Sequence, residues 1–358
     1  MEKPIIGISI GDINGIGPEI IIKTFADNRM LDLCTPVIFA SNKVINYYRR
    51  VVEEASFNFT STKDFTSLNP KQTNIFNCWN EEVPIQPGAL TESGGKYAIR
   101  SLQVAAQCLK DGQIDALVTA PIHKSNTQVS DFPYTGHTPF LQEKFGAKDV
   151  LMLLYSQELR VGLVTEHVPV SKIANYITKE RIASKVLLMK ETLIKDFGID
   201  KPKIAILGLN PHSGDDGNIG DEENQIIRPL VDSFQQQGML VYGPYSADAF
   251  FSRGHYKHFD GVLAMYHDQG LIPFKTLAQG EGVNFTAGLS VIRTSPDHGT
   301  AFDIAGKNRA DESSFREAIF QAIDLLRQRN QYLENTANPL RKGKIEKENL
   351  TATSDKSL

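Results

Sequence analysis

The feature that most constrains the fold of this chain is a series of short apolar runs, each followed at once by a polar or glycine-rich turn. Runs of this length are typical of buried strands. Longer segments with apolar residues at helical spacing lie between several of them. The strand-like runs are 4–10, 34–40, 114–120, 150–155, 160–165, 203–209 and 262–265, and the helical segments are 93–110, 171–197, 222–237 and 315–333. The alternation predicts an α/β fold with right-handed βαβ units and a mainly parallel sheet covered by helices on both faces.

Local patterns refine some of these elements. A polar segment, 156–158, lies between two of the strand-like runs, which predicts a hairpin there. The segment 171–197 is expected to form two helices broken near Thr178, with Ser171 as an N-cap. The segment 51–87 is polar and has no clear periodicity, so no element is predicted in it.

The length and composition exclude several classes of protein. A chain of 358 residues exceeds what one hydrophobic core usually supports, so two lobes are expected. A net charge of −4 with mixed signs argues against a nucleic-acid-binding surface. The three cysteines lack CxxC spacing, which argues against a disulfide framework and fits a reducing compartment. No signal peptide is visible and no apolar run approaches the roughly 20 residues that cross a bilayer, so we expect a cytoplasmic protein.

Three of the predicted strands end in a histidine. His167 follows the run at 160–165, His212 follows 203–209, and His267 follows 262–265. Ligands gather at the carboxyl ends of strands in open α/β sheets, so these imidazoles are expected to meet at one edge. Three imidazoles can hold a zinc-like ion and leave one position open. The pattern predicts a metal site, although eight histidines and no HExxH motif leave a structural role open for each.

Two cations and one glycine-rich turn are candidates for anion binding. Lys275 and Arg293 each have apolar neighbours in the sequence, and a cation buried there would need a partner such as an oxyanion. The alternative is that both are solvated surface residues. The turn at 11–17 precedes Pro18, a good first residue for a helix. Such a turn either binds an anion at the helix N-terminus or only packs closely.

Five motifs, in order, resemble the 4-hydroxythreonine-4-phosphate dehydrogenase family of pyridoxal phosphate biosynthesis. They are Gly11–Glu19, Thr135–Thr138, Leu209–His212, Ala264–Gly270 and Ile292–Thr300, and the resemblance runs from about Ile5 to Leu326. In addition, Asp297–Lys307 is similar to the nucleotide-binding loop of isocitrate and isopropylmalate dehydrogenases. The resemblance implies their two-lobed α/β/α fold, with the active site in the interlobe cleft and NAD or NADP bound without a GxGxxG motif.

The resemblance also implies site residues and an assembly. Metal ligation is implied for His167, His212 and His267, substrate binding for His137, Thr138, Lys275, Asn284 and Arg293, and cofactor binding for His298, Gly299, Asp303 and Gly306. A homodimer is implied, with the active site at the interface and His267 supplied by the partner chain. We expect 1–130 with 276–335 to form a cofactor-binding lobe, 131–275 a metal and dimerisation lobe, and 336–358 a disordered tail.

The implied reaction oxidises the C3 hydroxyl of 4-phospho-hydroxy-L-threonine and then releases CO2, which leaves 3-amino-2-oxopropyl phosphate. A divalent ion would assist both steps, and imidazole ligation favours zinc, cobalt or nickel, with magnesium also open. Asp248 and Asp268 are candidate proton acceptors, although we favour a role for both in orienting a metal-bound imidazole. Asp215 and Asp216 depart from the family pattern and either approach the metal or cap the next helix.

Three other functions compete with this interpretation. Relatives within the family oxidise 4-phosphorylated threonate or erythronate, which lack the amino group. A zinc hydrolase of phosphorylated substrates would explain the three histidines but not the loop at 297–307. A phosphate acyltransferase on a similar fold would need neither metal nor nicotinamide. The residues alone do not decide between NAD and NADP, and they do not identify the contact to the substrate's amine.

Overall fold

The computed structural model describes residues 3–54, 56–127 and 132–338, and within them all strands form one twelve-stranded sheet. Its order is β3-β4-β2-β1-β5-β12-β11-β6-β7-β10-β8-β9. The strands are β1 (Ile5–Ser9), β2 (Thr35–Ala40), β3 (Phe59–Thr62), β4 (Thr73–Asn77), β5 (Ala116–Thr119), β6 (Leu151–Tyr155), β7 (Arg160–Leu163), β8 (Ile204–Leu207), β9 (Val241–Tyr245), β10 (Gly261–Ala264), β11 (Val283–Ala287) and β12 (Ile292–Pro296).

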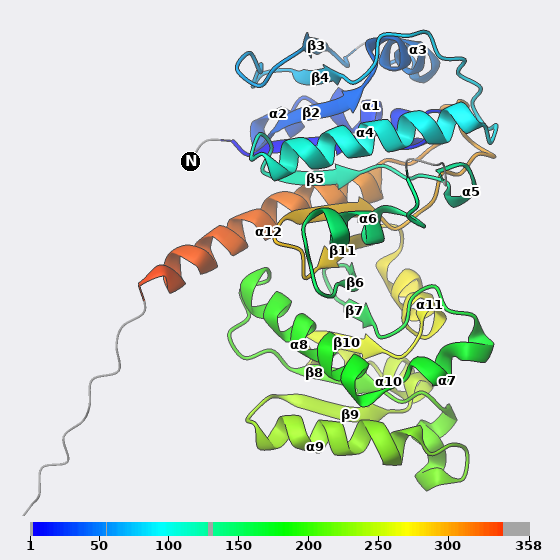
Figure 1. The fold of residues 1–358 in the computed structure, drawn as a ribbon, viewed down its shortest axis with the longest axis vertical. Coiled ribbons are helices and arrows are strands. Elements are labelled where there is room, and N and C mark those ends of the chain that lie inside the picture. Colours follow the sequence, from blue (N-terminus) through cyan, green and yellow to red (C-terminus); the bar gives the residue numbers. More distant parts are fainter. Residues whose placement is uncertain (1–2, 55, 128–131, 339–358) are drawn as a thin grey trace, which may run out of the picture.

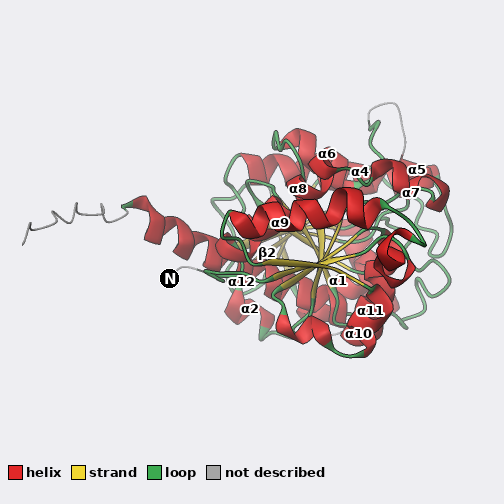
Figure 2. Cartoon of the chain, turned by 90° about the horizontal axis from the view of Figure 1, so that it is seen from below, coloured by secondary structure: helices red, strands yellow, loops and turns green. Residues whose placement is uncertain are grey.

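Helices cover both faces of this sheet (Figure 2). The α-helices are α1 (Gly17–Ala26), α2 (Met30–Leu33), α3 (Asn42–Val52), α4 (Glu92–Lys110), α5 (Lys124–Thr127), α6 (His137–Lys144), α7 (Ile173–Tyr176), α8 (Lys179–Lys195), α9 (Arg228–Gln236), α10 (Ala247–Ser252), α11 (His267–Ala278) and α12 (Ser313–Ala337). Short 3-10 turns occur at η1 (Val170–Lys172), η2 (Pro211–Gly217) and η4 (His255–His258), and η3 (Glu223–Ile227) is a π-helical turn before α9. The α/β class with a mainly parallel sheet is confirmed.

The sheet has two parallel halves joined by an antiparallel middle. One half of the sheet consists of β3, β4, β2, β1, β5 and β12, which run parallel to one another. The other half consists of β7, β10, β8 and β9, which are also mutually parallel. Between the halves, β11 and β6 pair antiparallel with each other and with their neighbours. Each strand turns by roughly 20–25° relative to the last. The fan of strands in Figure 2 shows the accumulated twist. As a result, α5 after β5 and α11 after β10 lie on the same side of the molecule, at the right of Figure 1, although their strands belong to oppositely directed halves.

Local sequence explains most element boundaries. Pro18 occupies the first turn of α1, and Thr178 caps α8 by accepting a hydrogen bond from the Arg181 amide, so the predicted break at Thr178 is confirmed. The hairpin is also confirmed, because β6 and β7 pair antiparallel. The prediction that Ser171 is an N-cap is wrong: Ser171 lies inside η1, and no side chain caps that turn.

Five strands were not predicted from the sequence: β3, β4 and β9 towards the edges of the sheet, and β11 and β12 in its middle. The strands β3 and β4 fall within 51–87, where no element was predicted, and β3 is half-buried with polar residues. The helix α12 extends to Ala337, so the start of the expected tail at 336 is helical, and 339–358 lie outside the described residues. Among the residues that the structure describes, no helix is both long and apolar enough to cross a membrane.

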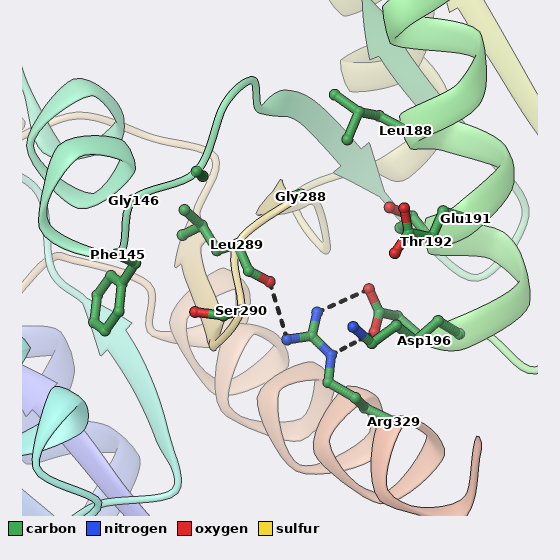
Figure 3. A pocket seen from close by; sticks show the side chains of 12 residues that line it. Phe145, Gly146, Leu188, Glu191, Thr192, Asp196, Gly288, Leu289, Ser290 and Arg329 are labelled. Carbon is green, nitrogen blue, oxygen red and sulfur yellow. Dashed lines mark hydrogen bonds and ion pairs between the residues drawn. The ribbon is translucent and has the colours of Figure 1, made fainter. Parts of the chain in front are cut away.

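A buried ion pair ties α12 to the second half of the molecule. Arg329 of α12 donates from Nε to Asp196 Oδ1 at 2.6 Å, from Nη2 to Asp196 Oδ2 at 2.9 Å, and from Nη1 to the Leu289 carbonyl at 3.2 Å (Figure 3). Asp196 is the C-cap residue of α8, and Leu289 lies between β11 and β12. Both side chains of the pair line a cavity of about 240 Å³, and no site residue predicted from the sequence lines this cavity. This guanidinium has a structural role.

Candidate functional site

Two adjoining cavities lie where the two halves of the sheet meet. The larger, of about 530 Å³, is lined by His137, Thr138, His167 and Asn284 among others. The smaller, of about 190 Å³, shares His137 and Asn284 with it and adds the loop after β12, including His298 and Gly299. The structure therefore brings together predicted substrate, metal and cofactor residues from α6, β11 and the loops after β7 and β12.

Arg293 lies directly behind the wall of the smaller cavity. Its side chain is 2% exposed, and its donors reach two hydroxyls: Nε and Nη2 donate to Thr119 Oγ1 at 3.2 and 2.5 Å, and Nη1 donates to Thr286 Oγ1 at 3.0 Å. Thr119 itself lines the cavity. No carboxylate among the described residues pairs with this guanidinium, and burial lowers its pKa. The prediction of a buried cation at position 293 is confirmed.

His137 lies close enough to Arg293 for the positive charge of the guanidinium to lower its pKa. Its pKa lies well below the ordinary value, first because of burial and then because of the positive charge of Arg293. The ring is therefore neutral near pH 7, and its buried Nε2 has no hydrogen-bond partner among the described residues. A buried polar nitrogen without a partner is costly, so a ligand atom at this point would be stabilised. Together, Arg293 and His137 form a site suited to an anion.

Lys275 differs from Arg293 in its surroundings. It is exposed on α11, and its Nζ donates to the Asp297 carbonyl at 2.8 Å. Of the two alternatives left open for Lys275, the structure shows the solvated one, and Ile272 on the same helix is itself 65% exposed. Lys275 nevertheless lies beside the loop after β12, whose Asp297 lines the smaller cavity.

Two of the three predicted metal ligands face each other within one chain. The ring centroids of His167 and His267 are 5.9 Å apart, and burial, Lys124 and His267 lower the pKa of His167. His212 lies on the wall of a third cavity, of about 480 Å³, which does not include the other two histidines. Within 3–54, 56–127 and 132–338, no group of three His, Cys, Asp or Glu side chains is placed to hold an ion. One chain thus assembles a pair rather than a trio.

The two candidate aspartates lie near these histidines. Asp268 Oδ1 is 2.7 Å from His267 Nδ1, an arrangement that fixes the orientation of the ring. Asp248 shares the third cavity with His212, and it accepts a hydrogen bond from Ser246 Oγ at 2.5 Å. This bond, with a smaller contribution from His212, lowers the pKa of Asp248.

The loop that carries His212 adopts an unusual backbone. His212 has a φ of 52° and Asp216 a φ of 54°, both in the left-handed region. Asp216 is exposed and lies 3.9 Å from Arg228, and Asp215 is also exposed. The helical segment that follows is therefore approached by Asp216 through Arg228, and also by Asn210, whose backbone amide donates to Glu223 Oε1 at 2.7 Å. The acidic pair therefore lies on the surface of this loop.

The predicted cofactor residues divide into two groups. His298 and Gly299 line the smaller cavity, and His298 Nε2 is buried without a partner among the described residues. Asp303 is exposed, and a Cβ on Gly306 would lie 2.5 Å from Pro87, so this glycine allows the loop to pack on the 86–88 turn. The first pair is thus open to a ligand, whereas Gly306 serves packing.

The glycine-rich turn before α1 is used for packing. A Cβ on Gly11 would lie 2.4 Å from the Pro121 carbonyl, and one on Gly17 would lie 2.4 Å from the Ile10 carbonyl. The Ile16 amide donates to the Thr300 carbonyl at 3.0 Å. Of the two roles left open for this turn, the geometry favours close packing against the cofactor loop.

Known proteins resemble this chain over most of its length. Residues 32–322 match the family model described as pyridoxal phosphate biosynthetic protein PdxA. The chain belongs to the PdxA family. A protein named 4-hydroxythreonine-4-phosphate dehydrogenase from Bacteroides thetaiotaomicron is 48% identical over 344 residues, which cover 96% of this chain and 94% of that protein. One of the same name from Sulfurihydrogenibium is 42% identical over 324 residues, covering 90% and 99%.

Solved PdxA-family structures agree with the fold. A crystal structure of 4-hydroxythreonine-4-phosphate dehydrogenase from Klebsiella pneumoniae superposes with a TM-score of 0.78 at 32% identity, covering 90% of this chain and 98% of that one. A branched-chain phosphotransacylase from Enterococcus faecalis, at 12% identity and a TM-score of 0.50, shares the fold alone. The predicted family resemblance is therefore confirmed.

Several residues in and behind the two adjoining cavities were not predicted from the sequence. Thr119 and Thr286 hold the Arg293 guanidinium, and nothing in their sequence neighbourhood signals that role. The larger cavity also contains Glu166 and an ion pair in which Lys185 Nζ lies 2.7 Å from Asp149 Oδ1. Burial raises the pKa of Glu166. The position of Glu166, directly before His167, was the signal available in the sequence.

Proposed function

We propose that this chain is a metal-dependent, NAD(P)-linked 4-hydroxythreonine-4-phosphate dehydrogenase. It would oxidise 4-phospho-hydroxy-L-threonine at C3 and release CO2, which leaves 3-amino-2-oxopropyl phosphate for pyridoxine 5'-phosphate synthesis. The observation that carries the proposal is the buried Arg293 guanidinium, which lacks a carboxylate partner among the described residues and lies beside the unpartnered Nε2 of His137. A dianionic phosphate supplies what this pair lacks.

The chain's own residues would orient the substrate. Arg293 has five N–H donors, and the hydroxyls of Thr119 and Thr286 occupy three of them. The remaining donors, with the Nε2 of neutral His137, would bind phosphate oxygens, and Thr138 and Asn284 would complete the pocket from the larger cavity. Lys275 would close it from the solvent side. His298 and Gly299 are proposed to approach the nicotinamide cofactor, because they line the smaller cavity next to this phosphate position.

A divalent ion fits the imidazoles in part. His167 and His267 are close enough to share one, and the lowered pKa of His167 favours the neutral, ligating form. One chain does not bring His212 to this pair, so we propose a homodimer in which a second copy completes the set. The pairing within one chain makes His212 the ligand that the second copy would supply, which differs from the family pattern, where His267 is the crossing ligand. When bound, the ion would acidify the C3 hydroxyl and stabilise the enolate that decarboxylation leaves.

The test is a direct assay of the purified protein with 4-phospho-hydroxy-L-threonine, NAD or NADP, and zinc, cobalt or magnesium. Reduced nicotinamide and CO2 should form in equal amounts, and a chelator should abolish both. Release of inorganic phosphate without reduced nicotinamide would instead indicate a hydrolase. For the metal, His212→Ala should lose bound ion by elemental analysis while circular dichroism stays unchanged, and full metal occupancy in that variant would refute the ligand assignment.

A second substrate deserves a parallel assay. A protein from Oceanobacillus iheyensis, provisionally named a D-threonate 4-phosphate dehydrogenase, is 39% identical over 329 residues that cover 90% of this chain. The phosphate-binding residues would serve either substrate equally. Turnover of D-threonate 4-phosphate that exceeds turnover of the amino substrate would replace the first assignment.

A further inference from the structure

The larger cavity contains two carboxylates, Asp149 and Glu166, and the proposed mechanism uses neither. Its lining residues with charged side chains are Lys124, Asp149, Glu166, Arg181 and Lys185. Asp149 is fully engaged: Oδ1 accepts from Lys185 Nζ at 2.7 Å and Oδ2 accepts from Ser184 Oγ at 2.6 Å. Glu166 forms no ion pair with any side chain that the structure describes, although the charge of Lys185 and the backbone of Met152 act on its carboxylate. It is therefore the carboxylate of this cavity that remains available to a ligand.

The backbone holds Glu166 in a defined position. The preceding residue, Thr165, donates from its amide to the Met265 carbonyl at 3.1 Å and from Oγ1 to the same carbonyl at 2.7 Å. The Val164 amide also donates to the Ala264 carbonyl at 2.9 Å, so the end of β7 is tied to the end of β10. Glu166 is half-buried at this point, next to His167. A carboxylate on such a support can recognise a group by position as well as by charge.

We infer that Glu166 binds the α-ammonium group of the substrate and thereby selects the amino acid over the corresponding hydroxy acid. This inference rests on the proposed function and adds its specificity determinant. The substrate carries two anionic groups, the phosphate and the carboxylate, and only one cationic group, the C2 ammonium. The phosphate would occupy the Arg293 and His137 end of the joined cavities, while Glu166 lines the larger cavity beside His167.

The chemistry accounts for the choice between the two candidate substrates. In 4-phosphothreonate a neutral hydroxyl replaces the C2 ammonium, so a carboxylate at this position keeps a hydrogen bond but loses the charge attraction. A half-buried carboxylate such as Glu166 is better compensated by a cation than by a hydroxyl. The cationic side chains of the same cavity, Lys124, Arg181 and Lys185, repel an ammonium group, and Asp149 is already paired with Lys185. Glu166 is therefore the residue that can attract an ammonium group into this cavity.

The test compares both substrates in the metal-loaded holoenzyme. Glu166→Gln keeps the size and hydrogen-bonding capacity and removes only the charge. We expect kcat/KM for 4-phospho-hydroxy-L-threonine to fall about 10- to 100-fold, mainly through KM, while kcat/KM for 4-phosphothreonate stays within about twofold. Glu180→Gln, an exposed glutamate at the start of α8, is the matched control and should leave both values unchanged.

The other outcomes are equally decisive. An equal fall for both substrates would show a structural role for Glu166 and overturn the inference, as would unchanged values for the amino substrate. A wild-type preference for 4-phosphothreonate would also overturn it. Oxidation of neither substrate by the wild-type enzyme would refute the proposed function itself, and the inference with it.

Discussion

Two arginines among the residues that the structure describes are buried, and their surroundings differ in one respect. Arg329 is 6% exposed and Arg293 is 2% exposed, and each makes three hydrogen bonds. The acceptors of Arg329 include both oxygens of Asp196, which carry a full negative charge. The acceptors of Arg293 are two neutral threonine hydroxyls. Within the part of the chain that the structure describes, the first cation has a carboxylate partner and the second has none.

This difference separates a structural charge from a binding charge. A buried ion pair stabilises the arrangement of the elements that contribute it, here α12 and the end of α8 (Figure 3). A buried cation without a counter-ion costs free energy in the empty protein, and an anion that binds there recovers it. We therefore expect substitutions at Arg329 to change stability and substitutions at Arg293 to change binding.

The largest expected effect is on the stability of Arg329→Met. The variant leaves the Asp196 carboxylate buried without a partner, which should lower the free energy of unfolding by about 3–5 kcal/mol. Urea denaturation followed by circular dichroism measures the loss. The double variant Arg329→Met with Asp196→Leu should recover most of it, because both charges are gone. An Arg329→Met protein as stable as wild type would remove the contrast.

The next effect is catalytic and concerns Arg293→Met. Without this buried charge partner for the phosphate, binding of the transition state should weaken by about 2–4 kcal/mol, which lowers kcat/KM roughly 30- to 1000-fold. The free energy of unfolding should fall by less than about 2 kcal/mol, since among the described residues the side-chain groups that lose a partner are the hydroxyls of Thr119 and Thr286. Steady-state kinetics and urea denaturation of the same preparation test both. A stability loss as large as that of Arg329→Met would mean that Arg293 is structural.

A smaller effect is expected in the pH dependence of stability through His137. Its pKa in the folded protein is lowered by burial and by Arg293, so the unfolded chain takes up a proton first as the pH falls. The contribution of His137 is therefore complete above about pH 6.5 and is lost below it, at up to about 1.4 kcal/mol per pH unit. Urea denaturation at several pH values should show a flatter profile for His137→Asn, and a partly flattened one for Arg293→Met. An unchanged slope in His137→Asn would contradict this.

Apolar neighbours in the sequence correctly indicated the burial of Arg293, which lies on a strand, but not the exposure of Lys275, which lies on a helix. Arg293 lies in β12, which is buried along its whole length, so apolar neighbours in sequence did imply burial. Lys275 lies on α11, where the apolar Ile272 faces solvent, so the same argument failed. Sequence neighbours on a strand inside a sheet share its burial, whereas those on a helix point in different directions.

The histidines show a second limit of the sequence argument. β7 and β10 are adjacent parallel strands in the sheet. The histidines that follow them, His167 and His267, therefore lie close together, as the position of each histidine after a strand-like run predicted. The left-handed backbone of η2 carries His212 into a separate cavity, and no apolar pattern encodes that turn. The contact of Thr119 with Arg293 joins segments far apart in the sequence, so only the folded structure could identify Thr119.

The most direct test of the contrast between the two arginines is the binding of inorganic phosphate measured by isothermal titration calorimetry. The account predicts that wild type and the Arg329→Met, Asp196→Leu double variant bind inorganic phosphate with the same affinity, and that Arg293→Met binds it at least about tenfold more weakly. Wild-type affinity in Arg293→Met would contradict the account, because the uncompensated guanidinium would then not be the group that binds the anion.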